Sequence, residues 1–83
     1  MNDFIENYNN PLMQAVRFTY KGTKYIVFGY WSISVIDESG DETEIDNGNL
    51  LTKYDALEYK VFDNGTKSLR DIYDKVSNVE FDF

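Results

Sequence analysis

Residues 25–36 read Tyr-Ile-Val-Phe-Gly-Tyr-Trp-Ser-Ile-Ser-Val-Ile, and this stretch decides the fold. Its first four residues are all apolar, whereas its second half alternates, with Trp31, Ile33 and Val35 on one face and serines on the other. Such β-branched and aromatic patterns indicate a strand buried on both faces that continues half-buried. Gly29 lies where the pattern changes, and glycine there favours a kink or bulge. We expect one long strand, or a bent pair of strands, as the spine of a small α+β domain.

The segment before this stretch also alternates between apolar and polar side chains, over residues 12–20. The dipeptide Lys21-Gly22 follows it, and glycine at this place favours a tight turn. Residues 12–20 and 23–30 are therefore predicted to form a β-hairpin.

Residues 1–10 allow two interpretations. Phe4, Ile5 and Tyr8 have the spacing of one helical face, so the segment forms either one or two helical turns or a loosely packed arm. Pro11 ends any such helix, because proline disfavours helical backbone in the residue before it.

Two turns and a short strand are expected after Ile36. Ser39-Gly40-Asp41 and 47–49 have turn composition, and residues 43–45 are predicted to return between them as a short third strand. Residues 52–55 then read as a capping box that begins a helix. The buried side of that helix is expected to include Leu57 and Val61, with Tyr54 or Ala56.

A last helix and a closing strand are predicted near the C-terminus. Residues 62–65, Phe-Asp-Asn-Gly, indicate a turn with Gly65 in a left-handed conformation. Thr66 or Ser68 then caps a helix. Its apolar face is Leu69, Ile72, Tyr73 and Val76. Residues 79–83 alternate and are expected to form a strand at the edge of the sheet.

These elements together predict an α+β fold in one domain spanning residues 1–83. The expected architecture is a single antiparallel sheet of about four strands in the order β-β-β-α-α-β, with two short helices on one face. The predicted core is Val16, Phe18, Ile26, Phe28, Trp31, Ile33, Val35, Leu57, Val61, Leu69, Ile72, Val76, Val79 and Phe81.

The composition removes several function classes. The chain has no histidine and no cysteine, so its own residues supply no Ser-His-Asp triad, no Cys-His pair and no zinc site with nitrogen or sulfur ligands. Catalysis by carboxylates would need a cleft that keeps one acid protonated, and 83 residues leave little room for it. We therefore expect a protein that is not an enzyme and has no cofactor.

The net charge of −7 also argues against direct nucleic-acid binding, which depends on Lys and Arg neutralising phosphates. Calcium binding by an EF-hand is not predicted either. A calcium loop that starts at Asp37 would have Glu42 at the position that needs glycine. One that starts at Asp41 would have Ile45 at a position that needs a ligand. No metal site is expected.

The acidic run itself is the candidate site for binding a partner. It holds six carboxylates and no base within ten residues. A rigid hairpin carrying them could imitate the phosphates of a nucleic acid and occupy a basic groove on a partner protein. The alternative is a solvated loop that protects a sheet edge, which is the more common role of such runs. The candidate partner-binding residues are Asp37, Glu38, Asp41, Glu42, Glu44, Asp46, Tyr54, Asp55 and Glu58.

The seven tyrosines allow a similar choice. They exceed what a small core can bury with every hydroxyl paired, so some are expected at the surface. Exposed tyrosine favours a protein interface, although it also serves as a rim residue on small sheets.

The order of these features resembles a group of small acidic proteins of phages and mobile elements of Gram-positive bacteria. The resemblance rests on 20–25, Tyr-Lys-Gly-Thr-Lys-Tyr, on the aromatic strand with Trp31, and on 62–73, Phe-Asp-Asn-Gly-Thr-Lys-Ser-Leu-Arg-Asp-Ile-Tyr. Many such proteins have no assigned function, and some are anti-CRISPRs or other inhibitors of host defence. The resemblance implies a protein of the bacterial host cytoplasm, and the sequence has neither a membrane-spanning run nor a signal peptide.

Two functions follow as expectations. The first is a phage-type inhibitor, anti-CRISPR or other anti-defence, that occludes the basic nucleic-acid-binding surface of a CRISPR effector or another nuclease. The second is an accessory phage protein that self-associates through the edge strand near Phe81 and Phe83.

Overall fold

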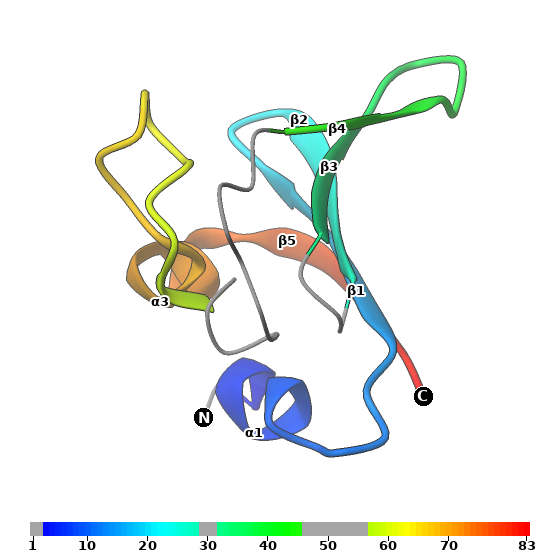
Figure 1. Cartoon of the computed structure of the whole chain (residues 1–83), viewed down its shortest axis with the longest axis vertical. Coiled ribbons are helices and arrows are strands. Elements are labelled where there is room, and N and C mark those ends of the chain that lie inside the picture. The colour runs from blue at the N-terminus through cyan, green and yellow to red at the C-terminus, as the bar shows by residue number, and fades with distance from the viewer. Residues whose placement is uncertain (1–2, 29–31, 46–56) are drawn as a thin grey trace.

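The computed structural model describes residues 3–28, 32–45 and 57–83, and it contains one five-stranded antiparallel sheet with short helices beside it (Figure 1). The sheet order is β4-β3-β2-β1-β5. The strands are β1 (Ala15–Tyr20), β2 (Thr23–Phe28), β3 (Ser32–Ile36), β4 (Glu42–Glu44) and β5 (Ser77–Asp82). The helices are α1 (Phe4–Tyr8), α3 (Leu69–Ile72) and the 3₁₀ turn η1 (Tyr73–Lys75). The α+β class is thus confirmed.

The predicted count of about four strands is wrong, because residues 25–36 supply two strands. β2 and β3 are antiparallel neighbours, with Val27 opposite Ile33 and Ile26 opposite Ser34. Folding back in this way gives the most apolar segments two neighbouring strands to pair with, so their buried N–H and C=O groups are satisfied. Gly29 and Trp31 lie outside the described residues.

The predicted hairpin between β1 and β2 is confirmed. Tyr20 pairs with Thr23, which leaves Lys21 and Gly22 as a two-residue loop. Both loop residues have a positive φ, 50° and 80° respectively. Two consecutive left-handed residues match the twist of the flanking strands, so the hairpin register follows from this dipeptide.

The turn predicted at residues 62–65 is also present, but the chain that leads into it differs from the prediction. The helical residues that precede this turn end at Glu58, so Val61 does not belong to a helix. The Val61 N–H instead donates to the Lys67 carbonyl at 3.0 Å, and Phe62 forms a bridge with Lys67. The predicted capping box at 52–55 lies outside the described residues.

Three successive left-handed residues make this second turn. Asp63, Asn64 and Gly65 have φ values of 52°, 60° and 81°. Asp, Asn and Gly are the residues that tolerate this conformation best, so the sequence pattern and the backbone agree.

Ser68, one of the two predicted caps, begins α3. The Asp71 carboxylate accepts hydrogen bonds from the Ser68 N–H at 2.9 Å and from the Ser68 hydroxyl at 3.0 Å. The bond from the Ser68 N–H is the first cause that lowers the pKa of Asp71. The side chain of Asp71 thus satisfies a backbone donor that the helix leaves unpaired.

The closing strand pairs at the sheet edge as predicted. β5 lies antiparallel to β1, with Val16 opposite Phe81 and Arg17 opposite Glu80. The register shifts between Arg17 and Thr19, and Asn78 in this region has a φ of 53°. This bulge increases the local twist of β5.

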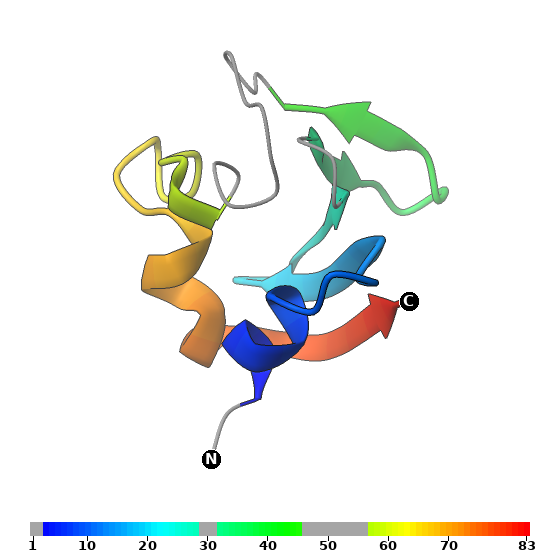
Figure 2. The same cartoon turned by 60° about the horizontal axis from the view of Figure 1, so that its bottom comes forward.

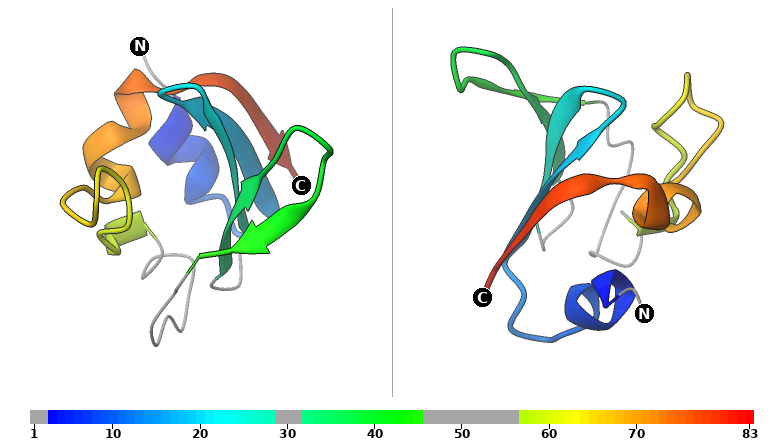
Figure 3. Two further views of the ribbon diagram at one scale, coloured as in Figure 1. Left: turned by 90° about the horizontal axis from the view of Figure 1, so that it is seen from above. Right: turned by 180° about the vertical axis from the view of Figure 1, so that it is seen from behind.

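α1 and α3 lie together on one side of the sheet (Figures 2 and 3). α1 is the helical alternative for the first ten residues, and it buries Phe4 and Tyr8. The core between helices and sheet is largely aromatic, and the Phe18 ring contacts those of Phe4, Tyr25 and Phe62 with centroids 6.2, 5.6 and 6.1 Å apart. Edge-on and offset ring contacts of this kind add to the free energy gained from burial.

Half of the predicted core residues are fully buried. The confirmed ones are Val16, Phe18, Ile26, Ile33, Leu57, Leu69 and Ile72. Phe28, Val35, Val61, Val76 and Phe81 are only partly buried. Val79 is exposed, so its assignment to the core is wrong. It lies on β5, an edge strand that pairs with a neighbouring strand on one side alone within the described chain. Core residues that the sequence reasoning missed are Phe4, Tyr8, Met13, Ala15, Tyr20, Val27 and Phe62.

The two turns are tied together by Asp63. Its carboxylate accepts hydrogen bonds from the Tyr20 hydroxyl at 2.8 Å and from the Lys21 ammonium at 2.9 Å. These bonds, that from Lys21 first, lower the pKa of Asp63 below its ordinary value of 3.8. The ionised carboxylate is therefore favoured by folding.

This contact gives a pH-dependent contribution to stability. Because the pKa of Asp63 is lower in the folded state, its contribution is complete above pH 3.8 and is lost as the pH falls through the folded pKa. We expect the melting temperature of the Asp63→Asn variant to fall less between pH 6 and pH 2 than that of the wild-type chain. Asparagine tolerates the same backbone conformation but does not titrate. Melting temperatures of both proteins between pH 2 and 6 test this. Melting temperatures that fall in parallel with pH in the two proteins would contradict a role of the Asp63 carboxylate.

Candidate functional site

The β3–β4 hairpin carries five of the candidate partner-binding residues. Figure 1 shows it projecting from the end of the sheet that lies away from α1. Every described acid from 37 to 44 is exposed. They are Asp37, Glu38, Asp41, Glu42 and Glu44. Asp46, Tyr54 and Asp55 lie outside the described residues.

Asp37 shapes the tip of this hairpin. Its Oδ1 accepts hydrogen bonds from the Ser39 N–H at 2.9 Å, the Ser39 hydroxyl at 2.8 Å and the Asp41 N–H at 3.0 Å. The Gly40 N–H donates to the Asp37 carbonyl at 3.0 Å, and Gly40 has a φ of 87°. The predicted turn at 39–41 is thus confirmed.

These bonds give the Asp37 carboxylate a structural role. The hydrogen bond from the Ser39 hydroxyl is the first cause that lowers the pKa of Asp37. Since one of its oxygens already accepts three bonds from its own turn, removing Asp37 would alter the shape of the hairpin as well as its charge. Glu38 and Glu42 can therefore be neutralised without removing a hydrogen bond of this turn. The Asp41 Oδ2 accepts only a long bond of 3.4 Å from the Ser39 hydroxyl, which an asparagine oxygen can still accept.

The register of β4 decides which way its acids face. The strand begins one residue earlier than predicted, at Glu42, and ends at Glu44. Glu42 is opposite Ile36 and Glu44 is opposite Ser34, while Thr43 is opposite Val35. Because side chains alternate along a strand, both glutamates share the sheet face turned away from the helices.

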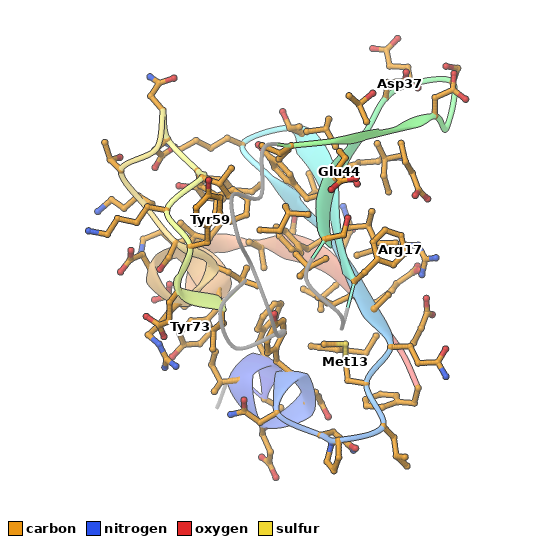
Figure 4. All side chains as sticks on the ribbon, in the orientation of Figure 1. Met13, Arg17, Asp37, Glu44, Tyr59 and Tyr73 are labelled. Atoms are coloured by element: carbon orange, nitrogen blue, oxygen red, sulfur yellow. The ribbon has the colours of Figure 1, made fainter. Side chains whose placement is uncertain are left out.

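Glu58 does not extend the acidic hairpin. It lies on the helix side, where its Oε1 pairs with the Nε of Arg70 in α3. In Figure 4, its neighbour Tyr59 lies close to the helices, and Asp37 stands at the far end of the β3–β4 hairpin. The structure thus pairs Glu58 with Arg70 of the same chain and places it away from the acidic hairpin.

The expectation of surface tyrosines is not borne out in the described part of the chain. Tyr8 and Tyr20 are buried. Tyr25, Tyr59 and Tyr73 are partly buried and pack against the core. The aromatic residues thus enlarge the core on the helix side, and the described tyrosines form no exposed patch.

The sequence reasoning missed the sheet face that the helices leave uncovered. Arg17 lies on this face (Figure 4), where one of its nitrogens pairs with the carboxylate of Asp82. Thr19, Lys24 and Ile36 lie in one row across β1, β2 and β3. A signal was present, because alternation in residues 15–20 puts Arg17 and Thr19 on the face opposite Val16 and Phe18.

This face is hollow, with a cavity of about 390 Å³ over the row of Thr19, Lys24 and Ile36. Ile26 lies on the same face, opposite Arg17, and is completely buried although none of the described helices covers this side (Figure 3). The strong curvature of the sheet explains both observations, since neighbouring strands then bring their side chains together over the middle of the face.

No family model matches the chain, and searches of curated proteins and of solved structures likewise returned no match. Among the residues that the structure describes, no group of three or more acidic side chains is placed to hold a metal ion. Within the same residues, no helix is both long enough and apolar enough to cross a bilayer.

Proposed function

We propose that this chain is a protein-binding module without enzymatic activity, and that the β3–β4 hairpin occupies a basic surface of its partner. The observation that carries the proposal is the hairpin itself. It presents Glu38, Asp41, Glu42 and Glu44 at its surface, and the hydrogen bonds of Asp37 fix the turn between them. A preorganised loop loses little conformational freedom on binding, so its charges are used efficiently.

The charge of the whole chain supports the same function. A net charge of −7 accelerates encounter with a positively charged surface and opposes contact with nucleic acid. In its most specific form, the proposal is a phage-type inhibitor, anti-CRISPR or other anti-defence, that blocks the nucleic-acid path of a nuclease in the bacterial cytoplasm. The absence of histidine and cysteine from the sequence supports the non-enzymatic part.

The test uses a variant that removes charge from the hairpin and keeps its shape. Glu38→Gln, Asp41→Asn and Glu42→Gln together change the net charge from −7 to −4 and leave Asp37 in place. We expect retention of a basic, nucleic-acid-handling partner from a Gram-positive lysate to fall about tenfold, because three exposed ion pairs of about 0.5 kcal/mol each sum to about 1.5 kcal/mol. Mass spectrometry identifies the partner, and duplex DNA should compete with the wild-type chain for it.

A second triple variant controls for net charge alone. Asp3→Asn, Glu6→Gln and Asp74→Asn also give −4, and these three exposed acids lie on α1 and η1 or beside them. Retention should be almost unchanged by this variant. Equal losses in the two variants would mean that the partner senses only the overall charge, and the hairpin proposal would be wrong.

A self-associating accessory protein is the second candidate, and one observation favours it. Leu12 and Phe83 are 71% and 55% exposed. Leu12 shortly precedes Ala15, Phe83 directly follows Asp82, and Ala15 and Asp82 are paired across β1 and the edge strand β5. Light scattering at high concentration tests it, together with Phe83→Ser. A monomer at all concentrations would exclude this function.

A further inference from the structure

One edge of the sheet, formed by β5, is open in the described part of the chain. β5 ends the strand order, so β1 is the only described strand that pairs with it. The strand at the other edge, β4, has three residues, whereas β5 has six. An edge strand presents a row of unpaired N–H and C=O groups that another chain can use for pairing. β5 is therefore the longer of the two edges to which a further strand can be added.

One hydrogen bond shows which backbone groups of β5 face the open side. The Gln14 N–H donates to the Asp82 carbonyl at 2.8 Å, so the backbone groups of Asp82 face β1. These groups alternate in direction along a strand, so those of Phe81 and Val79 face away from β1. A strand laid antiparallel to β5 would exchange two hydrogen bonds with Phe81.

The charged side chains of β5 lie on the uncovered face of the sheet. Glu80 is opposite Arg17 on β1, but Arg17 is paired with Asp82. Glu80 is exposed and has no ion-pair partner among the described residues. The open edge thus carries one carboxylate that a cation on an added strand can pair with.

The apolar side chains of β5 point to the other face, where the helices are. Phe81 packs against Phe4 of α1, with ring centroids 5.3 Å apart. Val79 and Phe83, on either side of Phe81, are exposed. An added strand would cover both if its own apolar side chains faced the same way.

A second copy of this chain does not suit the β5 edge. Two copies related by a two-fold axis would pair β5 with β5 around Glu80 or around Phe81. The first register puts Glu80 opposite Glu80, and the second puts Glu80 opposite Asp82. Like charges directly opposite each other destabilise a pair of strands. The net charge of −7 also opposes contact between two copies, so the edge favours a different chain.

We propose that the β5 edge binds an extended segment of the partner protein as an antiparallel strand, with a cationic side chain opposite Glu80 and apolar side chains opposite Val79 and Phe81. Both strands have the same two-residue repeat, and side chains directly opposite each other have Cβ atoms about 5 Å apart. The cation therefore reaches Glu80 while its apolar neighbours face the helix side. This inference rests on the proposed function, because it takes the partner to be basic, and it adds a second contact and a residue pattern.

A short peptide serves as the probe. Acetylated and amidated Val-Thr-Val-Arg-Val, laid antiparallel to residues 79–83, has its arginine opposite Glu80 and its central valine opposite Phe81. It is titrated into the full chain, and hydrogen exchange of the chain's backbone amides is followed by NMR. We expect the Phe81 amide to exchange about half as fast at half saturation, because the bound fraction is protected. The amides of Glu80 and Asp82 already face β1 and should keep their rates.

Two methylated peptides separate strand pairing from attraction between charges. Methylation of the central valine nitrogen removes the donor to the Phe81 carbonyl, whereas the threonine nitrogen points away from β5. Both peptides keep the charge and the side chains of the probe. We expect the first to bind about two- to tenfold more weakly than the probe, the range of one hydrogen bond. The second should bind like the probe.

Two variants of the chain test the charge pairing. Glu80→Gln should weaken the probe about two- to fivefold, the range of one exposed ion pair. Glu42→Gln removes the same charge from β4 at the opposite edge and should leave binding unchanged. Both glutamates are exposed, so both variants are expected to fold.

The outcomes also separate this proposal from the proposed function. Equal binding of the two methylated peptides overturns the edge proposal, as do equal effects of the two variants and an unchanged Phe81 amide at millimolar peptide. Protection of the Phe81 amide by raising the concentration of the chain alone would place a second copy at the edge and overturn it too. Each result leaves the hairpin function standing if the neutralised hairpin variant still loses its partner. Conversely, the expected peptide results with no effect of the hairpin acids on partner capture support the edge and refute the hairpin.

Discussion

The Phe18→Ala variant is expected to lose about 3–5 kcal/mol of its free energy of unfolding. Phe18 is almost completely buried at the centre of the aromatic core, and its ring contacts residues from α1, β2 and the turn that follows Val61. A cavity at this point cannot close, because its walls belong to elements that are fixed by separate hydrogen bonds. A domain of this size has a total stability near the lower end of about 5–15 kcal/mol, so most of it would be lost.

Urea unfolding followed by circular dichroism measures this effect. Phe83→Ala is the matched control, since it deletes the same side-chain atoms from a residue that is 55% exposed. The control should change stability by less than about 1 kcal/mol. Similar losses in the two variants would show that Phe18 is not at the centre of the core.

The Ile26→Ala variant is expected to lose about 2–5 kcal/mol, although no helix in the described part of the chain covers its side of the sheet. Ile26 is completely buried, with Arg17 and Ser34 opposite it on the two neighbouring strands. The expected loss is large because the curved sheet closes over this residue, whereas a flat, uncovered face would leave it in contact with water.

Ile36→Ala supplies the comparison for this second variant. Ile36 lies on the same face, opposite Lys24, but it is only partly buried. Its loss should be about 1 kcal/mol. If both substitutions cost the same small amount in urea unfolding, the sheet does not enclose Ile26 in solution and its burial here is contradicted.

Part of the candidate site was predictable from the sequence, because charge density is visible in any stretch of residues. The acidic run and its turn at Ser39-Gly40-Asp41 were identified in this way, and the structure places the described acids, from Asp37 to Glu44, and the turn on one hairpin. The structural role of Asp37 and the separate ion pair of Glu58 were not visible, since both depend on hydrogen-bond geometry. The hollow on the uncovered face was missed because its lining comes from β1, β2, β3 and β5, which are far apart in the sequence.

Features that depend on a few neighbouring residues could be predicted from the sequence alone. The turns at Lys21-Gly22 and at residues 63–65, the cap at Ser68 and the alternating closing strand all follow from local backbone preferences. These preferences act within a turn or a strand, so no knowledge of the rest of the chain is needed.

The pairing of the strands and the burial of their side chains became visible in the tertiary structure alone. It divided residues 25–36 between two neighbouring strands, left Val79 exposed at an edge, and buried Ile26 on the side without helices. Burial depends on pairing between residues far apart in sequence and on the curvature of the whole sheet, and neither quantity is contained in a local pattern.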